Sequence, residues 1–171
     1  MLNRQKKRRL FFALWPSDKV RQSIVETFSR LPRQIKRRVR RPQNLHVTLY
    51  FVGQVTEPTK DCMHAAAQSV TAEGFQLNLD CFGHFPKAKI FWMGSQNMPA
   101  QLDHLHKKLG DAIADCGFKS ETRPFSPHVT LMRKCTEPVI EYEEFSLPWY
   151  VEGFSLIESV QGVSGVEYRV V

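Results

Sequence analysis

The tetrapeptide His-Val-Thr-Leu occurs twice in the sequence, at residues 46–49 and again at residues 128–131. Both copies lie in a common nine-residue frame, in which an arginine, a proline and the tetrapeptide itself recur at an offset of 82 residues. Side chains two residues apart in a β-strand point to the same face. Each histidine therefore shares a face with its threonine (His46 with Thr48, His128 with Thr130), and the valines and leucines point into a core.

Two histidines and two threonines around one point suit acid–base chemistry on a phosphodiester. Histidine has an unperturbed pKa of ~6.5, so one neutral ring can act as general base and one protonated ring as general acid. Threonine hydroxyls donate hydrogen bonds to anionic oxygens, and basic side chains neutralise charge in the transition state. A strained cyclic phosphate needs the least help from a metal. The sequence has no G-x-S-x-G motif and no Gly-rich phosphate loop, so acyl transfer and nucleoside triphosphate hydrolysis have no support.

The elements that position the two motifs also repeat. Each motif follows an aromatic strand and an amphipathic helix, predicted at residues 10–15 and 18–31 for the first copy and at 89–93 and 99–116 for the second. We therefore expect two similar lobes related by an approximate two-fold axis. The further predictions are motif strands at 46–51 (ending at Gly53) and 128–133, a helix at 58–72, strands at 75–85 and 89–94, and a strand-rich tail at 145–171.

The composition favours one compact domain. The 171 residues are 42% hydrophobic and 24% charged, which excludes a mainly disordered, collagen-like or coiled-coil chain. We expect a single bilobal domain over residues 1–171, with residues 1–8 as a candidate disordered basic tail. Residues 1–41 hold fourteen lysines and arginines against Asp18 and Glu26, a net charge of +12, and the remainder carries −5. This asymmetry suggests a polyanionic partner, nucleic acid before a membrane surface; a solvated basic face is the alternative.

The apolar run at residues 10–15 is far shorter than the ~20 residues that cross a bilayer, and no cleavage-site pattern of a signal peptide follows it. We interpret it as a strand and expect a cytoplasmic protein. The cysteines are far apart and have no C-x-x-C spacing, so reduced thiols are expected and a structural zinc site is not: Cys62, Cys81, Cys116 and Cys135.

The two motifs and their surroundings resemble the two-histidine (2H) phosphoesterases, and within them the RNA 2′,3′-cyclic phosphodiesterases, also called 2′-5′ RNA ligases. The resemblance rests on residues 10–14, 44–53 and 123–133 and extends over nearly the whole chain. It implies an α+β, bilobal fold in which two antiparallel sheets face a central cleft and helices pack on the outside. It also implies hydrolysis of RNA 2′,3′-cyclic phosphate ends to 2′-phosphates without a metal or other cofactor. It also implies reversible 2′-5′ RNA ligation, with an RNA 5′-hydroxyl in place of water.

The resemblance also implies roles for individual residues. His46 and His128 are the catalytic pair, the first as proton donor and the second as acceptor, while Thr48 and Thr130 hold the phosphate. Arg133 matches an arginine that contacts the phosphate. Simple alternation places it opposite His128, so this role requires the strand to end or bulge nearby. Two interpretations stay open for Phe125, stacking on a base or forming a hydrophobic plug before the strand. The aromatic residues of the first strand are expected in the core: Phe11, Phe12 and Trp15.

Two other functions stay open from the sequence. One is nucleotide or RNA binding without catalysis, although the presence of both histidines and both threonines argues against it. The other is the same chemistry on another cyclic or 2′-5′-linked nucleotide. The basic stretch at residues 33–41 favours a longer polyanion, so RNA with a 2′,3′-cyclic end is expected as the partner ahead of small nucleotides. No membrane and no obligate protein partner are implied, and a monomer is expected.

Overall fold

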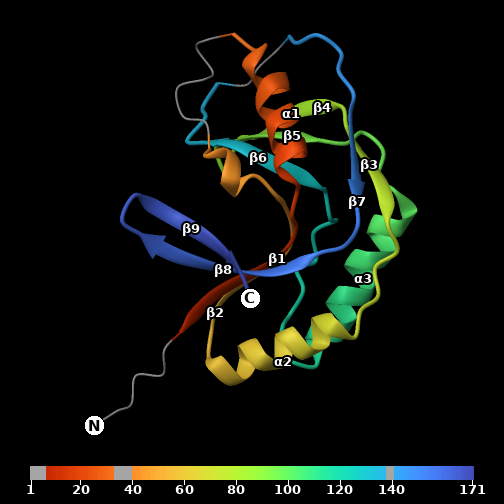
Figure 1. Cartoon of the computed structure of the whole chain (residues 1–171), viewed down its shortest axis with the longest axis vertical. Helices are drawn as coiled ribbons and strands as arrows, with labels where there is room; N and C mark the ends of the chain where they lie inside the picture. Colours follow the sequence, from red (N-terminus) through yellow and green to blue (C-terminus); the bar gives the residue numbers. More distant parts are fainter. Residues whose placement is uncertain (1–6, 33–39, 138–140) are drawn as a thin grey trace.

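The computed structural model of the chain describes residues 7–32, 40–137 and 141–171 (Figure 1). The elements in chain order are β1 (Arg8–Leu14), α1 (Asp18–Ser29), the 3₁₀ segment η2 (Pro42–Asn44), β2 (Val47–Val55), α2 (Glu57–Gln68), β3 (Phe75–Leu79), β4 (Cys81–Phe85), β5 (Ile90–Gly94), α3 (Ala100–Ala114), β6 (His128–Arg133), β7 (Leu147–Val151), β8 (Ser155–Gly162) and β9 (Gly165–Val170). The strand pairs are antiparallel. The α+β class implied by the resemblance is confirmed.

Both motif strands lie in the larger of two sheets. Seven strands form this sheet in the order β4-β5-β6-β2-β1-β8-β9, and β3 pairs with β7 in a second sheet of two strands. The two sequence repeats form the two halves of the large sheet, with β1 and β2 in one half and β5 and β6 in the other. The halves meet where β2 and β6 pair through one residue pair, Val47 with Val129. The repeat therefore brings its two copies together inside a continuous sheet.

Alternation along β1 separates the main core from a second face. Phe12 enters the main core, as expected from the sequence, together with side chains from all three helices. Phe11 and Ala13 point the other way and form a small separate cluster with Ile157, against which Trp15 packs. The prediction that Phe11 lies in a core is confirmed, because Phe11 is buried, although in a cluster on the face of the sheet opposite to Phe12. Trp15 is only partly buried against that cluster.

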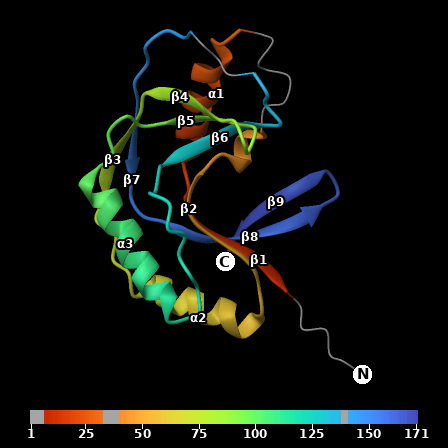
Figure 2. The ribbon, with the colours of Figure 1, turned by 180° about the vertical axis from the view of Figure 1, so that it is seen from behind.

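The helices begin and end where local chemistry predicts. Ser17 caps α1, since its hydroxyl accepts a hydrogen bond from the backbone N–H of Val20. Beyond α3, Gly117 has a φ of 83°, the left-handed conformation that glycine adopts most readily after a helix. Figure 2 shows α3 on one side of the molecule and the β8–β9 hairpin projecting from the other. Within the described ranges, no helix is long and apolar enough to span a membrane.

Most predicted helix and strand boundaries differ from the structure by a few residues, and three differences have an identifiable physical reason. The predicted strand at 75–85 is two strands, because the chain changes sheets at Asp80, whose carboxylate accepts a hydrogen bond from the backbone N–H of Gln96 at 2.9 Å. The first motif strand continues past Gly53, which has a φ of 85° and pairs with Leu10. Arg8 lies in β1 and bonds both Glu57 and Glu158, so the candidate disordered tail does not include it; residues 1–6 lie outside the described residues.

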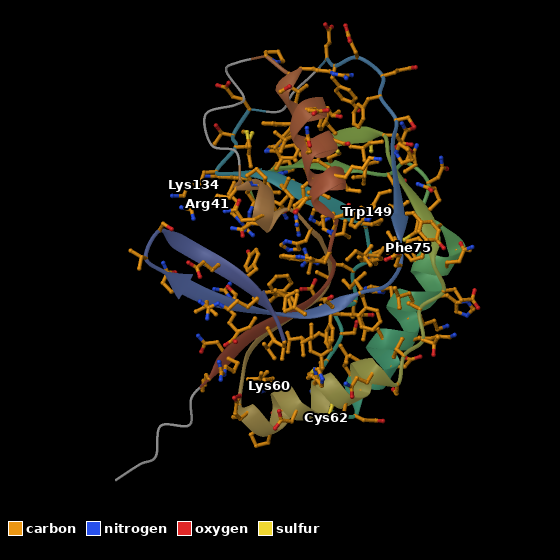
Figure 3. The ribbon with its side chains drawn as sticks, in the orientation of Figure 1. Arg41, Lys60, Cys62, Phe75, Lys134 and Trp149 are labelled. Carbon is orange, nitrogen blue, oxygen red and sulfur yellow. A yellow bond between two sulfur atoms is a disulfide. The ribbon has the colours of Figure 1, made fainter. Side chains whose placement is uncertain are left out.

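The expectation of four reduced thiols is wrong for two cysteines. Cys62 of α2 and Cys116, just beyond α3, form a disulfide with their Cα atoms 5.8 Å apart. Figure 3 labels Cys62 on α2, and α2 and α3 pack against each other. The sequence did not predict this contact, because the two cysteines are 54 residues apart and only tertiary packing brings the middle of α2 to the end of α3. Cys81 and Cys135 are free, as expected.

Candidate active site

The two motifs meet at the junction between the halves of the large sheet. Their valines pair with one another across β2 and β6 in antiparallel register. Continuing this register by one residue places His46 across from Thr130. In the other direction it places Thr48 across from His128. Directly opposed residues of an antiparallel pair have Cβ atoms about 4.5–5.5 Å apart, so the register puts the four side chains in one cluster with approximate two-fold symmetry.

Both histidine rings are held by the same local hydrogen bond. His46 Nδ1 lies 2.8 Å from the carbonyl oxygen of Asn44, and His128 Nδ1 lies 2.8 Å from that of Ser126. A carbonyl oxygen only accepts, so Nδ1 carries the proton in each neutral ring and Nε2 keeps a lone pair. The reactive atom of each ring is therefore Nε2. That of His46 lies 3.1 Å from the Thr48 hydroxyl oxygen.

A β-bulge in each motif strand determines which later residues join the histidines. The pairing of β6 with β5 skips Leu131, and the pairing of β2 with β1 skips Leu49, the same position of the motif. The extra residue shifts the alternation by one. Arg133 and Phe51 therefore lie on the histidine face, where simple alternation would not place them. The condition that the sequence set for Arg133, a nearby bulge, is met.

Aromatic side chains flank both imidazoles. The ring of His46 has three aromatic neighbours with centroid distances of 4.8, 5.7 and 5.3 Å: Phe11, Trp15 and Tyr168. The ring of His128 has two, at 5.0 and 6.1 Å: Phe85 and Trp92. These rings displace water from the flanks of the imidazoles. Electrostatic interactions at Nε2 are stronger in such surroundings than in bulk water.

Both histidines are neutral in the free site at neutral pH. Burial lowers the pKa of His46 to about 4; its bond to Asn44 opposes this change, and the positive charges of Arg40 and Arg133 add to it. Burial also lowers the pKa of His128. An anion between the rings would offset the arginine charges and favour protonation of one imidazole. Binding of an anion would therefore make one imidazole available as a proton donor.

Arg40 and Tyr168 belong to this face, and the sequence analysis missed both. Arg40 Nη2 donates to the Tyr168 hydroxyl at 2.7 Å, and the backbone N–H of Arg40 donates to the carbonyl of Leu131 at 2.8 Å. These bonds link β6 to the β8–β9 hairpin beside His46. Burial and the nearby charges of Arg40 and Arg9 lower the pKa of Arg133, so several guanidinium groups gather here. In the sequence, Arg40 is one of several basic residues in a run and does not stand out from them. No local sequence pattern marks Tyr168 as a site residue.

Phe125 lies elsewhere. Its ring stacks at 4.0 Å on that of His106 of α3, which in turn stacks at 4.2 Å on Tyr50. Tyr50 is buried in the main core, on the helix side of β2. The structure therefore does not bring Phe125 to the histidine face, and the hydrophobic plug is the interpretation that this placement fits.

The donor set of the histidine face suits an anion. Arg40, Arg133 and two threonine hydroxyls offer hydrogen-bond donors, and the Nδ1 atoms of both histidines are engaged with carbonyls. Over residues 7–32, 40–137 and 141–171, no group of three or more histidine, cysteine, aspartate or glutamate side chains is arranged to hold a metal ion. Phosphate is the anion that guanidinium and hydroxyl donors bind well.

We expect the free energy of unfolding to fall as the pH is lowered from about 6.5 to about 4. The unfolded chain protonates His46 near pH 6.5, whereas the folded chain resists protonation until about pH 4. Protons therefore bind preferentially to the unfolded chain in this window, at a cost of at most about 3 kcal/mol. Urea unfolding at pH 7 and pH 4.5 measures the loss. The His46→Gln variant should lose less stability than the wild type; an equal loss in both contradicts the burial of a neutral ring.

Comparison with known proteins gives one consistent family. A family model described as the 2′-5′ RNA ligase superfamily matches residues 16–162. The chain is 32% identical over 153 residues to the RNA 2′,3′-cyclic phosphodiesterase of Escherichia coli (strain K12), covering 88% of this chain and 86% of that protein. Among solved structures, E. coli LigT in apo form superposes with a TM-score of 0.87 at 27% identity, covering 97% of this chain and 95% of that one. E. coli LigT complexed with 3′-AMP gives 0.85 at 28%, with coverages of 97% and 96%.

Proposed function

Since the chain belongs to the 2′-5′ RNA ligase superfamily, we propose that it hydrolyses the 2′,3′-cyclic phosphate at the end of an RNA chain and leaves a 2′-phosphate. The observation that carries this proposal is the pair of histidines held alike, each with Nδ1 bonded to a carbonyl, which leaves Nε2 as the atom for proton transfer. The E. coli relative named for this activity matches most of the chain. The cyclic phosphate of an RNA end is an anion of the kind this face suits.

The proposed reaction needs one base, one acid and donors to the phosphate. His128 Nε2 removes a proton from water, and the water oxygen forms a bond to phosphorus. The bond from phosphorus to the 3′ oxygen breaks, and His46 Nε2 gives its proton to that oxygen. Thr48, Thr130 and Arg133 donate hydrogen bonds to the non-bridging oxygens, where negative charge accumulates. The products are a 2′-phosphate and a free 3′-hydroxyl.

The donor role of His46 depends on substrate binding. Its pKa of about 4 keeps it neutral in the free enzyme. The phosphate neutralises Arg133 and lies beside the ring, and both effects raise the affinity of Nε2 for a proton. With an RNA 5′-hydroxyl in place of water the same step would give 2′-5′ ligation: His128 removes the proton of the 5′-hydroxyl and His46 protonates the departing 3′ oxygen. The two histidines would exchange roles only in the reverse step, cleavage of the 2′-5′ linkage.

The decisive experiment is incubation with 2′,3′-cyclic-phosphate RNA in excess EDTA. We expect complete conversion, with the phosphate on the 2′ oxygen, as ³¹P NMR distinguishes from a 3′-phosphate. A 3′-phosphate product, or loss of activity on chelation, contradicts the mechanism. Nucleotide binding without any product after long incubation would support the alternative of a non-catalytic module.

Phe51 is a candidate base-stacking surface on the histidine face. It is 53% exposed, and the guanidinium of Arg9 lies 5.2 Å from its ring centroid. Stacking on an aromatic ring contributes about 1–3 kcal/mol per base. We expect Phe51→Ala to raise KM for 2′,3′-cyclic AMP about ten-fold, with kcat changed much less, as steady-state kinetics would show.

Phe125→Ala is the matched control for this variant. Removal of the half-buried Phe125 ring from its stack on His106 should lower the free energy of unfolding by about 2 kcal/mol. It should leave kcat and KM within two-fold of the wild type. A ten-fold rise in KM for Phe125→Ala, with Phe51→Ala unchanged, would reverse the two assignments and restore the base-stacking interpretation of Phe125.

We also propose that the enzyme acts as a monomer in the cytoplasm. The side chains of the proposed mechanism all come from one sheet of one chain, so no residue of a second copy is needed. The Cys62–Cys116 disulfide is unusual for a reducing compartment. Light scattering and cell fractionation test the two statements separately.

A further inference from the structure

A pocket of about 410 Å³ lies beside the histidine face, between α1, η2 and β9; we call it the α1–β9 pocket. Two of its lining residues are also neighbours of the proposed catalytic ring of His46. The ring centroids of Trp15 and Tyr168 lie 5.7 and 5.3 Å from the centroid of that ring. Asn44, whose carbonyl holds His46 Nδ1, lines it as well. The pocket and the proposed catalytic site therefore share a wall.

Three arginines line the α1–β9 pocket, Arg21, Arg41 and Arg169, against one acidic residue, Glu167. The carboxylate lies 3.2 Å from Arg169 Nη2 and is paired with it. Arg41 bonds the hydroxyl and carbonyl of Ser164 at the tip of the hairpin, and Figure 3 labels Arg41 beside this hairpin. The lining keeps a net positive charge after these pairs are formed.

The strongest indication that this pocket binds an anion comes from Arg21. Its side chain is only 12% exposed, and its guanidinium lies 5.0 Å from the centre of the Trp15 ring. Nη1 contacts Asp18 at 2.9 Å, but Nε and Nη2 are buried and have no hydrogen-bond partner in the described part of the chain. A buried charged donor without a partner is costly. Nε and Nη2 are a pair of donors whose fork geometry matches two oxygens of one phosphate, and the side chains that cover them would move aside when a phosphate binds.

From this geometry we propose that the α1–β9 pocket binds the internal phosphodiester that precedes the cyclic end of the RNA chain. The inference rests on the proposed function and specifies its substrate. When the cyclic phosphate lies at the histidines, the next phosphate of the chain is the nearest further anion, and the pocket begins at the wall behind His46. The site then prefers an oligonucleotide end to a mononucleotide, since a 2′,3′-cyclic mononucleotide has no second phosphate to place there.

The test compares adenosine 2′,3′-cyclic phosphate with the dinucleotide ApA carrying a 2′,3′-cyclic phosphate. Arg21→Gln should lower kcat/KM for the dinucleotide about ten-fold, mainly through KM, and leave the mononucleotide within two-fold. The slope of log kcat/KM against log salt for the dinucleotide should flatten by about 0.7, the value for one phosphate contact on a single strand. Arg30→Gln is the matched control, because Arg30 is an exposed arginine just beyond the end of α1, outside this pocket.

Two results overturn the subsite. An equal loss for both substrates shows that Arg21 acts only through the packing of Trp15 and His46, and no loss for the dinucleotide shows that the pocket holds no phosphate. Calorimetric binding of the ApA 2′-phosphate product, weaker for Arg21→Gln than for Arg30→Gln, tests the pocket without turnover. A wild-type chain that binds this product in that way but opens neither cyclic substrate contradicts the proposed function and leaves the subsite standing.

Discussion

Replacement of either His46 or His128 by alanine is expected to lower kcat for a 2′,3′-cyclic nucleotide by about a thousand-fold, with KM changed far less. Positioned general acids and bases each contribute about 10²–10⁴-fold. The two rings are held in the same way, by a 2.8 Å bond from Nδ1 to a carbonyl two residues earlier. Steady-state kinetics of both variants in EDTA measures the effect.

Two further variants complete this test: the double histidine variant, and a control substitution at a histidine outside the candidate site. Because the proposed mechanism requires the two histidines to act as a unit, His46→Ala with His128→Ala should be little slower than either single variant. His104→Ala removes an exposed histidine of α3 and should leave kcat unchanged. A single variant that retains a tenth of the wild-type kcat contradicts the assignment of that histidine.

A substrate with a sulfur leaving group would show which histidine acts as the acid and which acts as the base. A cyclic substrate with sulfur in place of the 3′ oxygen releases a thiolate, which needs no proton to depart. His46→Ala should then regain most of its lost rate on this substrate, whereas His128→Ala should not, because the attacking water still needs a base. Rescue of the His128 variant instead would exchange the two roles.

The sequence contained enough information to predict the central histidine pair of the candidate site. The nine-residue repeat placed two His-x-Thr pairs on strands in equivalent surroundings, and period-two alternation put each histidine with its threonine. The same alternation failed at Arg133 and Phe51. Their positions depend on a bulge at the leucine of each motif, and a bulge is defined by the partner strand rather than by the residues themselves.

The sequence predictions missed three other features for a second reason: the place of Tyr168, the Cys62–Cys116 bond and the break between two strands at Asp80. Each is set by contacts between segments far apart in sequence: the pairing of β8 with β1, the packing of α2 on α3, and the choice of β4 to pair with β5 while β3 pairs with β7. Periodicity within one segment carries no information on these choices. Phe125 is a further case of the same kind, since its position before the strand was clear from the sequence but its stacking partner on α3 was not.

Removal of the Cys62–Cys116 disulfide is expected to lower the free energy of unfolding by about 4 kcal/mol. The bond closes a loop of 54 residues between α2 and the end of α3, and the entropy of closing such a loop in the unfolded chain gives this value. The loop contains β3, β4, β5 and α3, so the cross-link restricts a large part of the second repeat. Urea unfolding of the Cys62→Ser, Cys116→Ser double variant against the wild type measures the difference.

Reduction of the disulfide in the wild-type protein is the control that separates loss of the bond from any effect of the two serine side chains. Dithiothreitol should lower the wild-type stability by a similar amount and leave the double variant unchanged, because Cys81 and Cys135 are free thiols and form no cross-link. Turnover at 25 °C should survive in both cases, since the bond lies between helices on the outer side of the sheet and away from both histidines. Two reactive thiols at Cys62 and Cys116 in the protein purified without reductant, shown by alkylation and mass spectrometry, would contradict the bond itself.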